Sequence, residues 1–548
     1  MSLTAAQQRA VAARGNVLVM AGAGTGKTST LVARCIDCLS GEDRASLDQL
    51  LVVTFTEAAA AEARERIRAA LEEQLETTGA ETWAHQLALF DAAHIGTLHS
   101  FCFQLVRQHF YQLGLDPQVS VLDEGQAVMA AEEVLDELLN EHYASNSAEA
   151  VAVQRLIETY GGGRDDSIRQ LVQRLHAYSQ TRADAAEWRA RQVELFSSPE
   201  PTQWREWLLA GMARWRTAWL ADLAELTSSN PKAKECADLL ASLPSEFTRA
   251  QADAVLKQLV AAKASPWPPR RKTELLKPLE ELFDAAEFLA ALAPTSRGDP
   301  LAEDRNWSRE PMLALLRLTQ QFGERFQERK RAEGVMDFHD LEQFALELLW
   351  DRENRQPTDL ARRWRDKFHF VFVDEYQDIN AAQDRILTAL SRDGAEANRF
   401  LVGDVKQSIY RFRLADPGLF RRYAKDWQRE AGQTISLAEN FRSRATILEF
   451  VNAVFTPLMH ADIGGVDYDE AARLIPGGGR TTTPSPDTVE ILVRLTERSP
   501  EPESGANALD DLQSAEKEAR HVALHLQALV ASGFQITDRE TRQPRAVE

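Results

Sequence analysis

The segment AGAGTGKT, residues 21–28, has the residue types and spacing of a loop that binds phosphate. Its glycines allow a turn tight enough for successive backbone N–H groups to face phosphate oxygens. Lys27 offers a positive charge to the β and γ oxygens, and Thr28 offers a hydroxyl to Mg2+. A glycine-rich turn without a ligand is the alternative, and the GKT triplet argues against it. The predicted triphosphate-binding residues are Ala21, Gly22, Ala23, Gly24, Thr25, Gly26, Lys27 and Thr28.

A second segment, FVFVDEYQDIN, places two carboxylates directly after an apolar stretch. Asp374 suits the coordination shell of Mg2+, and Glu375 is placed to polarise an attacking water. An Asp–Glu pair after a strand also occurs in solvated turns. The upstream phosphate-binding loop favours a shared site for the two segments.

The segment GDVKQSIYRFR combines a glutamine with an aromatic and basic cluster. Gln407 could sense a γ-phosphate. Tyr410 and Phe412 alternate with Arg411 and Arg413, and such clusters stack unpaired bases and hold their phosphates. We therefore predict that Tyr410, Phe412 and Arg413 bind a single nucleic-acid strand.

Three further segments allow two interpretations each. TFTEAAAAEARERI and GTLHSFC carry hydroxyls and a histidine that could bond a phosphodiester backbone, or the hydroxyls could cap helices. ENFRSR carries Arg442, which could reach a γ-phosphate from a neighbouring domain or form a surface ion pair. The candidate backbone contacts are Thr54, Phe55, Thr56, Thr97, His99 and Ser100.

These residues need strands that deliver them to one place. Short apolar runs at 16–20, 50–55, 368–373 and 399–403 each lead into polar residues, and helical patterns lie between them. The sequence therefore predicts an α/β fold, with a parallel sheet covered by helices on both faces. The site is expected at the carboxyl ends of the strands.

The chain changes character after the second strand region. Apolar residues at helical spacing, without a convincing strand, predict a large all-α insertion. Towards the end, TVEILVRL (488–495) alternates like a strand and residues 514–534 form an amphipathic helical pattern. The expected organisation is one α/β domain in two parts, 1–123 and 335–436, a helical insertion at 124–334, and the beginning of a second α/β domain at 437–548.

Composition limits the classes of protein. Sixty-three basic and 83 acidic residues give a net charge of −20, which argues against a globally basic nucleic-acid binder but allows a local groove. Four cysteines in 548 residues argue against a disulfide framework, and Cys35 and Cys38 fit helix packing better than zinc binding. No apolar run is long enough to predict a membrane-spanning helix, and the first residues do not resemble a signal peptide. We expect a cytoplasmic protein.

The motifs, in this order, resemble the superfamily 1 DNA helicases of the UvrD and Rep type. TLHSFC, MDFHDLEQFALELL and VGDVKQSIYRFRLADPGLF are most similar to the AddA branch, the helicase–nuclease subunits of AddAB repair complexes, with RecB more distant. The resemblance implies a RecA-like nucleotide-binding domain that uses ATP and Mg2+ to move 3′ to 5′ along DNA. It also implies single-stranded DNA and DNA ends as partners, an AddB-like partner subunit, and a role in double-strand-break repair and recombination.

The resemblance also implies roles for single residues. Gln7, in LTAAQ, would recognise adenine, and Gln377 and Gln407 would couple the nucleotide state to DNA binding. Arg442 resembles the first of two arginines that stabilise the transition state. Phe412 stands where UvrD-type proteins usually have tryptophan. The implied catalytic set is Lys27, Glu375, Gln377, Gln407 and Arg442.

Some helicase motifs are not found after residue 450. No segment resembles the late motif with the second transition-state arginine, and no nuclease block is present. The sequence therefore resembles the N-terminal portion of a longer helicase, and we expect weak ATP hydrolysis from it alone. Two alternatives are a P-loop ATPase without unwinding activity and a non-catalytic scaffold that binds DNA ends.

Overall fold

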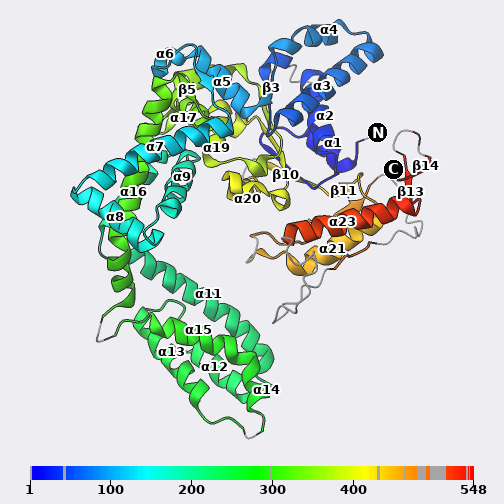
Figure 1. The fold of residues 1–548 in the computed structure, drawn as a ribbon. Coiled ribbons are helices and arrows are strands. Elements are labelled where there is room, and N and C mark those ends of the chain that lie inside the picture. Colours follow the sequence, from blue (N-terminus) through cyan, green and yellow to red (C-terminus); the bar gives the residue numbers. More distant parts are fainter. Residues whose placement is uncertain are drawn as a thin grey trace. The chain divides into compact units, whose positions relative to one another are not determined.

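The computed structural model contains two compact units, Met1–Ser485 and Pro486–Glu548 (Figure 1). The residues that it describes are 3–40, 45–268, 270–295, 298–428, 432–461, 465–470, 472–477, 489–493, 514–538, 541 and 543–548.

The first unit is built on a six-stranded parallel sheet. Its strands lie in the order β10 (Gln433–Leu437), β1 (Val17–Ala21), β9 (Arg399–Gly403), β8 (Phe370–Val373), β2 (Leu50–Thr54) and β3 (His94–Thr97). The predicted parallel sheet is confirmed, and β1, β2, β8 and β9 fall within a residue or two of the predicted strands. The two edge strands were not predicted, because β3 is short and β10 mixes polar with apolar residues.

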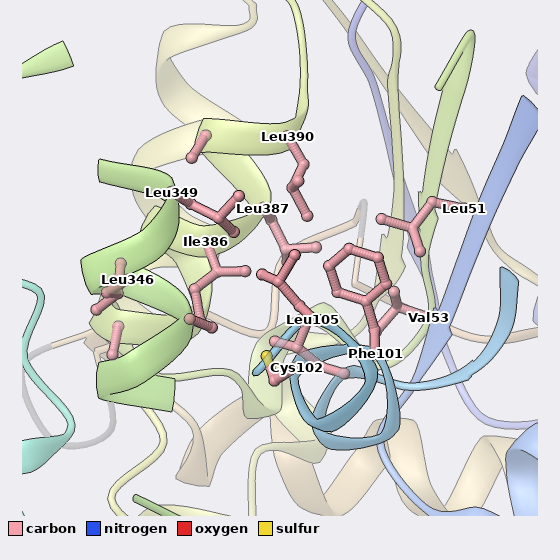
Figure 2. Close-up of a cluster of buried hydrophobic side chains, with 14 of the residues drawn as sticks. Leu51, Val53, Phe101, Cys102, Leu105, Leu346, Leu349, Ile386, Leu387 and Leu390 are labelled. Carbon is pink, nitrogen blue, oxygen red and sulfur yellow. The ribbon is translucent and has the colours of Figure 1, made fainter. Parts of the chain in front are cut away.

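Helices cover both faces of this sheet, as predicted. Along β2, Leu50 and Val52 point into one apolar core, while Leu51 and Val53 point into the other, as the two-residue period of a strand requires. Figure 2 shows part of the second core, where Leu51 and Val53 face Phe101 and the leucines of two helices. The first core is covered by α1 (Ala5–Ala12), α2 (Lys27–Ser40), α3 (Glu57–Thr78) and α4 (Glu81–Ala88). The second is covered by α5 (Leu98–Gln108), α17 (Phe338–Leu349), α18 (Asp359–Lys367), α19 (Ala381–Leu390) and α20 (Pro417–Asp426).

A long helical segment separates the first three strands of the sheet from the last three (Figure 1). Its first core joins α7 (Glu124–Ala144), α8 (Ala148–Gly161), α9 (Asp166–Gln180) and α16 (Pro300–Ala332), and α10 (Ala185–Ser197) lies against α9 and α16. Its second core joins α11 (Thr202–Leu226), α12 (Pro231–Ala241), α13 (Arg249–Ala264), the neighbourhood of α14 (Lys272–Leu276), and α15 (Glu280–Ala291).

Two very short strands close this helical segment. β4 (Ser120–Val121), where the chain leaves, pairs in parallel with β5 (Val335–Met336), where it returns. Backbone hydrogen bonds from Ser120 N–H to the Gly334 carbonyl and from Leu122 N–H to the Met336 carbonyl extend the pair. Nearby short elements are α6 (Phe110–Leu113), β6 (Trp350–Asp351) and β7 (Gln356–Pro357).

The rest of the chain carries few described elements. In the first unit, β11 (Glu439–Asn440) pairs with β12 (Ile475–Pro476), and α21 (Ala445–Leu458) lies between them. The second unit contains α23 (Ser514–Ala531), which confirms the predicted helix, and the antiparallel strands β13 (Gln535–Thr537) and β14 (Pro544–Ala546). The strand predicted at 488–495 is not seen in 489–493, and its remaining residues lie outside the described ones.

All four cysteines are buried and unbonded to one another, which fits helix packing. Among the described residues, no three His, Cys, Asp or Glu side chains are grouped as a metal site. No helix in the described part of the chain has the length and apolar content needed to cross a membrane.

Candidate functional site

Three neighbouring strands carry the chemically active loops at their carboxyl ends. β1 leads into the glycine-rich loop, β8 into Asp374 and Glu375, and β9 into Asp404 and Gln407. Because all strands of the sheet are parallel, these loops meet at one edge. The next two strands, β2 and β3, end at Thr54 and Thr97 along the same edge.

The glycine-rich loop is held in a tight turn. Gly24 and Gly26 adopt φ of +74° and +84°, and a Cβ atom on Gly24 would lie 2.6 Å from the Cβ of Arg442. The buried Thr25 hydroxyl donates to the Gly22 carbonyl at 2.7 Å. Lys27 begins α2, so the loop ends at the positive end of a helix, which suits phosphate.

Gln7 lies against this loop. Its Nε2 donates to the Thr25 carbonyl at 3.1 Å, and its Oε1 accepts the Thr4 N–H at 2.9 Å as part of a capping box. Gln7 is buried. Its side-chain amide lies so close to Gly26 that position 26 has no room for a side chain. Gln7 therefore supports the loop as well as being the predicted adenine contact.

Lys27 and Glu375 form an ion pair across the site. The lysine Nζ lies 2.8 Å from Oε1 and 2.6 Å from Oε2 of Glu375. Glu375 adopts the left-handed backbone region, with φ 50° and ψ 44°, which is uncommon for a residue with a side chain. Such strain occurs often at functional positions, and here it turns the carboxylate toward the lysine.

The carboxyl groups on either side of Glu375 have raised pKa values. Burial raises the pKa of Asp374 to about 6, the Glu375 charge adds to the rise, and Lys27 opposes it. Burial and Glu375 also raise the pKa of Asp378 to about 6, against its hydrogen bond from Gln377. Within the described structure, Asp378 Oδ1 is buried without a hydrogen-bond partner. The site therefore has an excess of negative charge that a cation would relieve.

The excess of negative charge at the site predicts that Asp374→Asn stabilises the folded chain at neutral pH. Between pH 3.8 and about 6 the folded chain keeps a proton that the unfolded chain has lost, so the ionised carboxyl lowers stability above pH 6. We expect Asp374→Asn to raise Tm by about 1–3 °C at pH 8, and the gain to vanish near pH 4. Thermal unfolding at both pH values measures this. The exposed Asp366→Asn is the control, and a lower Tm for Asp374→Asn at pH 8 would contradict the prediction.

Gln377 and Gln407 are linked through Asp404, a residue that the sequence alone did not single out. The buried Gln377 donates from Nε2 to Glu375 Oε2 at 2.9 Å, and its Oε1 accepts the Asp404 N–H at 2.9 Å. Asp404 Oδ2 accepts from Gln407 Nε2 at 2.8 Å, and Oδ1 pairs with Lys406 Nζ at 2.8 Å. A continuous polar chain thus runs from Lys27 through Glu375 to Gln407.

The segment around Arg442 is attached to the glycine-rich loop. Asn440 Nδ2 donates to the Ala23 carbonyl at 2.6 Å, and Phe441 N–H donates to the Gly24 carbonyl at 2.8 Å. Asn440 Oδ1 accepts the Arg442 N–H at 2.9 Å, while the Arg442 side chain is exposed. The structure therefore places Arg442 beside the loop, with Asn440 fixing its backbone.

Three aromatic rings and an arginine form a cluster at the adjacent loops. The ring centroids of Phe55 and Tyr410 are 5.0 Å apart, and those of Tyr410 and Phe412 are 5.7 Å apart. The Arg413 guanidinium lies 5.4 Å from the Tyr410 centroid. Phe412 is 73% exposed, so this aromatic cluster presents the open face of that ring. The contact of Phe55 with Tyr410 was not predicted, because the two residues lie far apart in the sequence.

The predicted hydroxyl residues serve as local caps. Thr56 caps α3 and Thr97 caps α5, each accepting a backbone N–H in the first turn. The Thr97 and Ser100 hydroxyls also donate to Glu57 Oε1 at 2.9 and 3.0 Å. The buried Thr54 hydroxyl donates to the Thr56 carbonyl.

His99 faces the protein interior rather than its neighbouring hydroxyls. Its Nε2 lies 3.0 Å from Oε1 of the buried Glu342 on α17. The capping interpretation thus applies to Thr56 and Thr97. Contact of the hydroxyl residues and of His99 with a nucleic-acid backbone remains a prediction.

Comparison with known proteins decides the family. A family model described as the UvrD/REP helicase N-terminal domain matches residues 3–428. The chain belongs to this UvrD/REP helicase family. An ATP-dependent helicase/nuclease subunit from Bacillus licheniformis is 32% identical over 574 aligned residues, which cover 99% of this chain and 46% of that protein. The protein of the same name from Bacillus velezensis is 35% identical over 565, covering 97% and 45%.

The UvrD/REP match covers every predicted site residue except Arg442. The chain spans slightly less than half the length of these curated relatives. The residues whose roles were missed from the sequence are Glu57, Glu342, Asp404 and Asn440. Only Asp404 gave a signal, since it directly follows a predicted strand.

The UvrD/REP domain's polar residues fit a magnesium–nucleotide complex. Lys27 and the glycine-rich loop can bind phosphate, and Asp374 is a half-buried carboxylate with a neighbouring like charge. The Thr28 hydroxyl is half-buried and makes no hydrogen bond with another described residue. With few protein ligands grouped there, Mg2+ would be held by Thr28, Asp374, phosphate oxygens and water, as this ion usually is.

Proposed function

We propose that the chain is the nucleotide-hydrolysing and DNA-binding part of an ATP-dependent DNA helicase that translocates 3′ to 5′. The proposed reaction is hydrolysis of ATP with Mg2+, coupled to movement along single-stranded DNA from a DNA end. The UvrD/REP family and the helicase/nuclease names of the similar Bacillus proteins support this. From the same similarity we propose a cytoplasmic role in double-strand-break repair and recombination, with an AddB-like partner subunit.

The observation that carries the proposal is the loop after β9. At its start, Asp404 and Gln407 are hydrogen-bonded into the polar chain that reaches Glu375 and Lys27. At its end, the exposed Phe412 ring contacts Tyr410 in the aromatic cluster. A rearrangement of Gln407 on nucleotide binding would therefore be transmitted to the rings through a short length of backbone.

The geometry supports the following proposed roles. When bound, the magnesium–nucleotide complex supplies the reacting phosphoryl group and a Lewis acid. Lys27 binds phosphate oxygens, Thr28 and Asp374 hold the ion, and Arg442 reaches the γ-phosphate from beside the loop. Glu375 accepts a proton from the attacking water.

Glu375 changes partners in this scheme. In the structure its carboxylate pairs with Lys27. Phosphate oxygens compete for the same ammonium group, so nucleotide binding frees the carboxylate to orient water. Gln377, which already donates to Glu375 Oε2, keeps the carboxylate in place during the exchange.

Replacing the exposed Phe412 ring together with the half-buried Tyr410 ring tests the DNA site. We expect Tyr410→Ala with Phe412→Ala to weaken binding of single-stranded DNA about 30-fold or more, since base–aromatic stacking contributes ~1–3 kcal/mol per base. Fluorescence anisotropy of a labelled oligothymidylate measures Kd. The exposed pair Tyr160 and Trp307 on the helical insertion, replaced by alanine together, is the matched control.

Stimulation of ATP hydrolysis by DNA tests the whole proposal. We expect single-stranded DNA to increase turnover, and the double ring variant to require more DNA for half-maximal stimulation. Nucleotide binding without any DNA binding would favour a P-loop ATPase without unwinding activity. DNA binding without measurable ATP turnover by the wild-type chain would favour a non-catalytic scaffold.

A further inference from the structure

Glu342 is a buried carboxylate that joins three separate parts of the first unit. It lies on α17 and is 3% exposed. Its Oε2 accepts from Asn380 Nδ2 at 2.9 Å, and its Oε1 accepts from Gln383 Nε2 at 2.6 Å. The same Oε1 lies 3.0 Å from His99 Nε2. The carboxylate therefore connects α17 with the first turns of α5 and α19.

The surroundings keep this carboxylate charged. Burial alone would raise the pKa of Glu342, but the hydrogen bond and charge of His99 outweigh it and hold the pKa below the ordinary value. His339 and the hydrogen bond from Asn380 act in the same direction. Burial raises the pKa of the Cys102 thiol, and the charge of Glu342 adds to the rise.

Packing alone does not explain a charge at this position. The neighbouring residues Leu341, Phe344, Ala345 and Leu346 belong to the apolar core beneath the sheet. A buried ion pair usually stabilises a fold no more than well-packed apolar side chains do. The three polar partners therefore point to a role in fixing geometry.

The segments that Glu342 connects are the two that the proposed function must coordinate. His99 lies between Thr97 and Ser100, the candidate contacts to a DNA backbone. Asn380 caps α19 and closely follows Asp378, at the end of the acidic segment. Glu342 thus ties the start of α5 directly to the segment that carries the catalytic carboxylates.

We propose that Glu342 is a positioning residue for DNA binding, an inference that rests on the proposed function. It fixes the His99 ring, which also packs edge-on against Phe338 with centroids 5.1 Å apart. The His99 side chain remains 32% exposed. In the proposed arrangement, that exposed part of the ring contacts a phosphate of the DNA strand.

The test compares Glu342→Gln with Glu347→Gln, an exposed glutamate on the same helix. We expect Glu342→Gln to raise Kd for a labelled oligothymidylate about five- to tenfold, through weaker fixing of the histidine. Affinity for a fluorescent ATP analogue with Mg2+ should stay within about twofold of the wild type, and Glu347→Gln should match the wild type in both. Unchanged DNA binding in Glu342→Gln would overturn the proposal, and so would an equal loss of nucleotide binding.

A second variant separates positioning from general damage to the fold. His99→Gln should weaken DNA binding by a similar factor, and the double variant should be no weaker than either single one, because both act through one contact. Independent, multiplying losses would overturn the proposal. If the wild-type chain itself bound no single-stranded DNA, the proposed function would be rejected. That outcome is distinct from one in which the wild type binds DNA and the Glu342→Gln variant binds it equally well, which rejects only the role of Glu342.

Discussion

Glu375→Gln is expected to lower DNA-stimulated ATP turnover about 10²–10⁴-fold while binding of Mg·ATP persists. The amide keeps the size of the carboxylate and can still accept the hydrogen bond from Gln377, but it cannot take a proton from water. Removing the negative charge also frees Lys27 from its ion pair, so nucleotide affinity should not fall. Steady-state phosphate release and equilibrium binding of a fluorescent nucleotide measure the two effects separately.

The control for this change is Glu396→Gln, an exposed glutamate before β9 at the opposite end of the sheet. It should leave both turnover and nucleotide binding at the wild-type level. A Glu375→Gln variant with wild-type turnover would assign the proton transfer to another group. Loss of nucleotide binding along with turnover would assign Glu375 a structural role.

Lys27→Ala is expected to weaken binding of Mg·ATP about 30-fold or more and to remove measurable turnover. The lysine side chain is 11% exposed, so its charge acts on phosphate with little screening by solvent. The change also leaves Glu375 without a positive partner beside Asp374 and Asp378. These three carboxylates would then repel an anionic nucleotide and weaken its binding further.

Titration with a fluorescent nucleotide at constant Mg2+ measures the loss. Lys425→Ala, which removes an exposed lysine from α20, should bind like the wild type. Lys27→Arg keeps the charge and should retain more affinity than Lys27→Ala. Equal affinity of Lys27→Ala and the wild type would show that the glycine-rich loop does not bind phosphate.

The sheet and its active edge were predictable because they depend on local patterns. Strands buried on both faces appear as short apolar runs, and the chemically active residues directly follow them in the sequence. The glycine-rich loop and the Asp374–Glu375 pair were therefore found at the carboxyl ends of neighbouring strands. The edge strands β3 and β10 lack such a run, because one side of each is open or polar.

The partners of the site residues were not predictable, since they depend on contacts between distant segments. Asn440 reaches the Ala23 carbonyl across 417 positions of sequence, and His99 reaches Glu342 across 243. No spacing rule relates residues so far apart. Thr97 shows a different limit, because a hydroxyl at the start of a helix looks the same in sequence whether it caps the helix or binds a phosphate.

The short parallel pair β4–β5 has a consequence for how such a protein can evolve. Because the chain leaves and re-enters the sheet domain at neighbouring strands, the ends of the helical segment are held together whatever its length. Lengthening or shortening that segment therefore costs little loop-closure entropy in the sheet domain. During evolution this segment can therefore gain or lose helices while the catalytic edge of the sheet keeps its geometry.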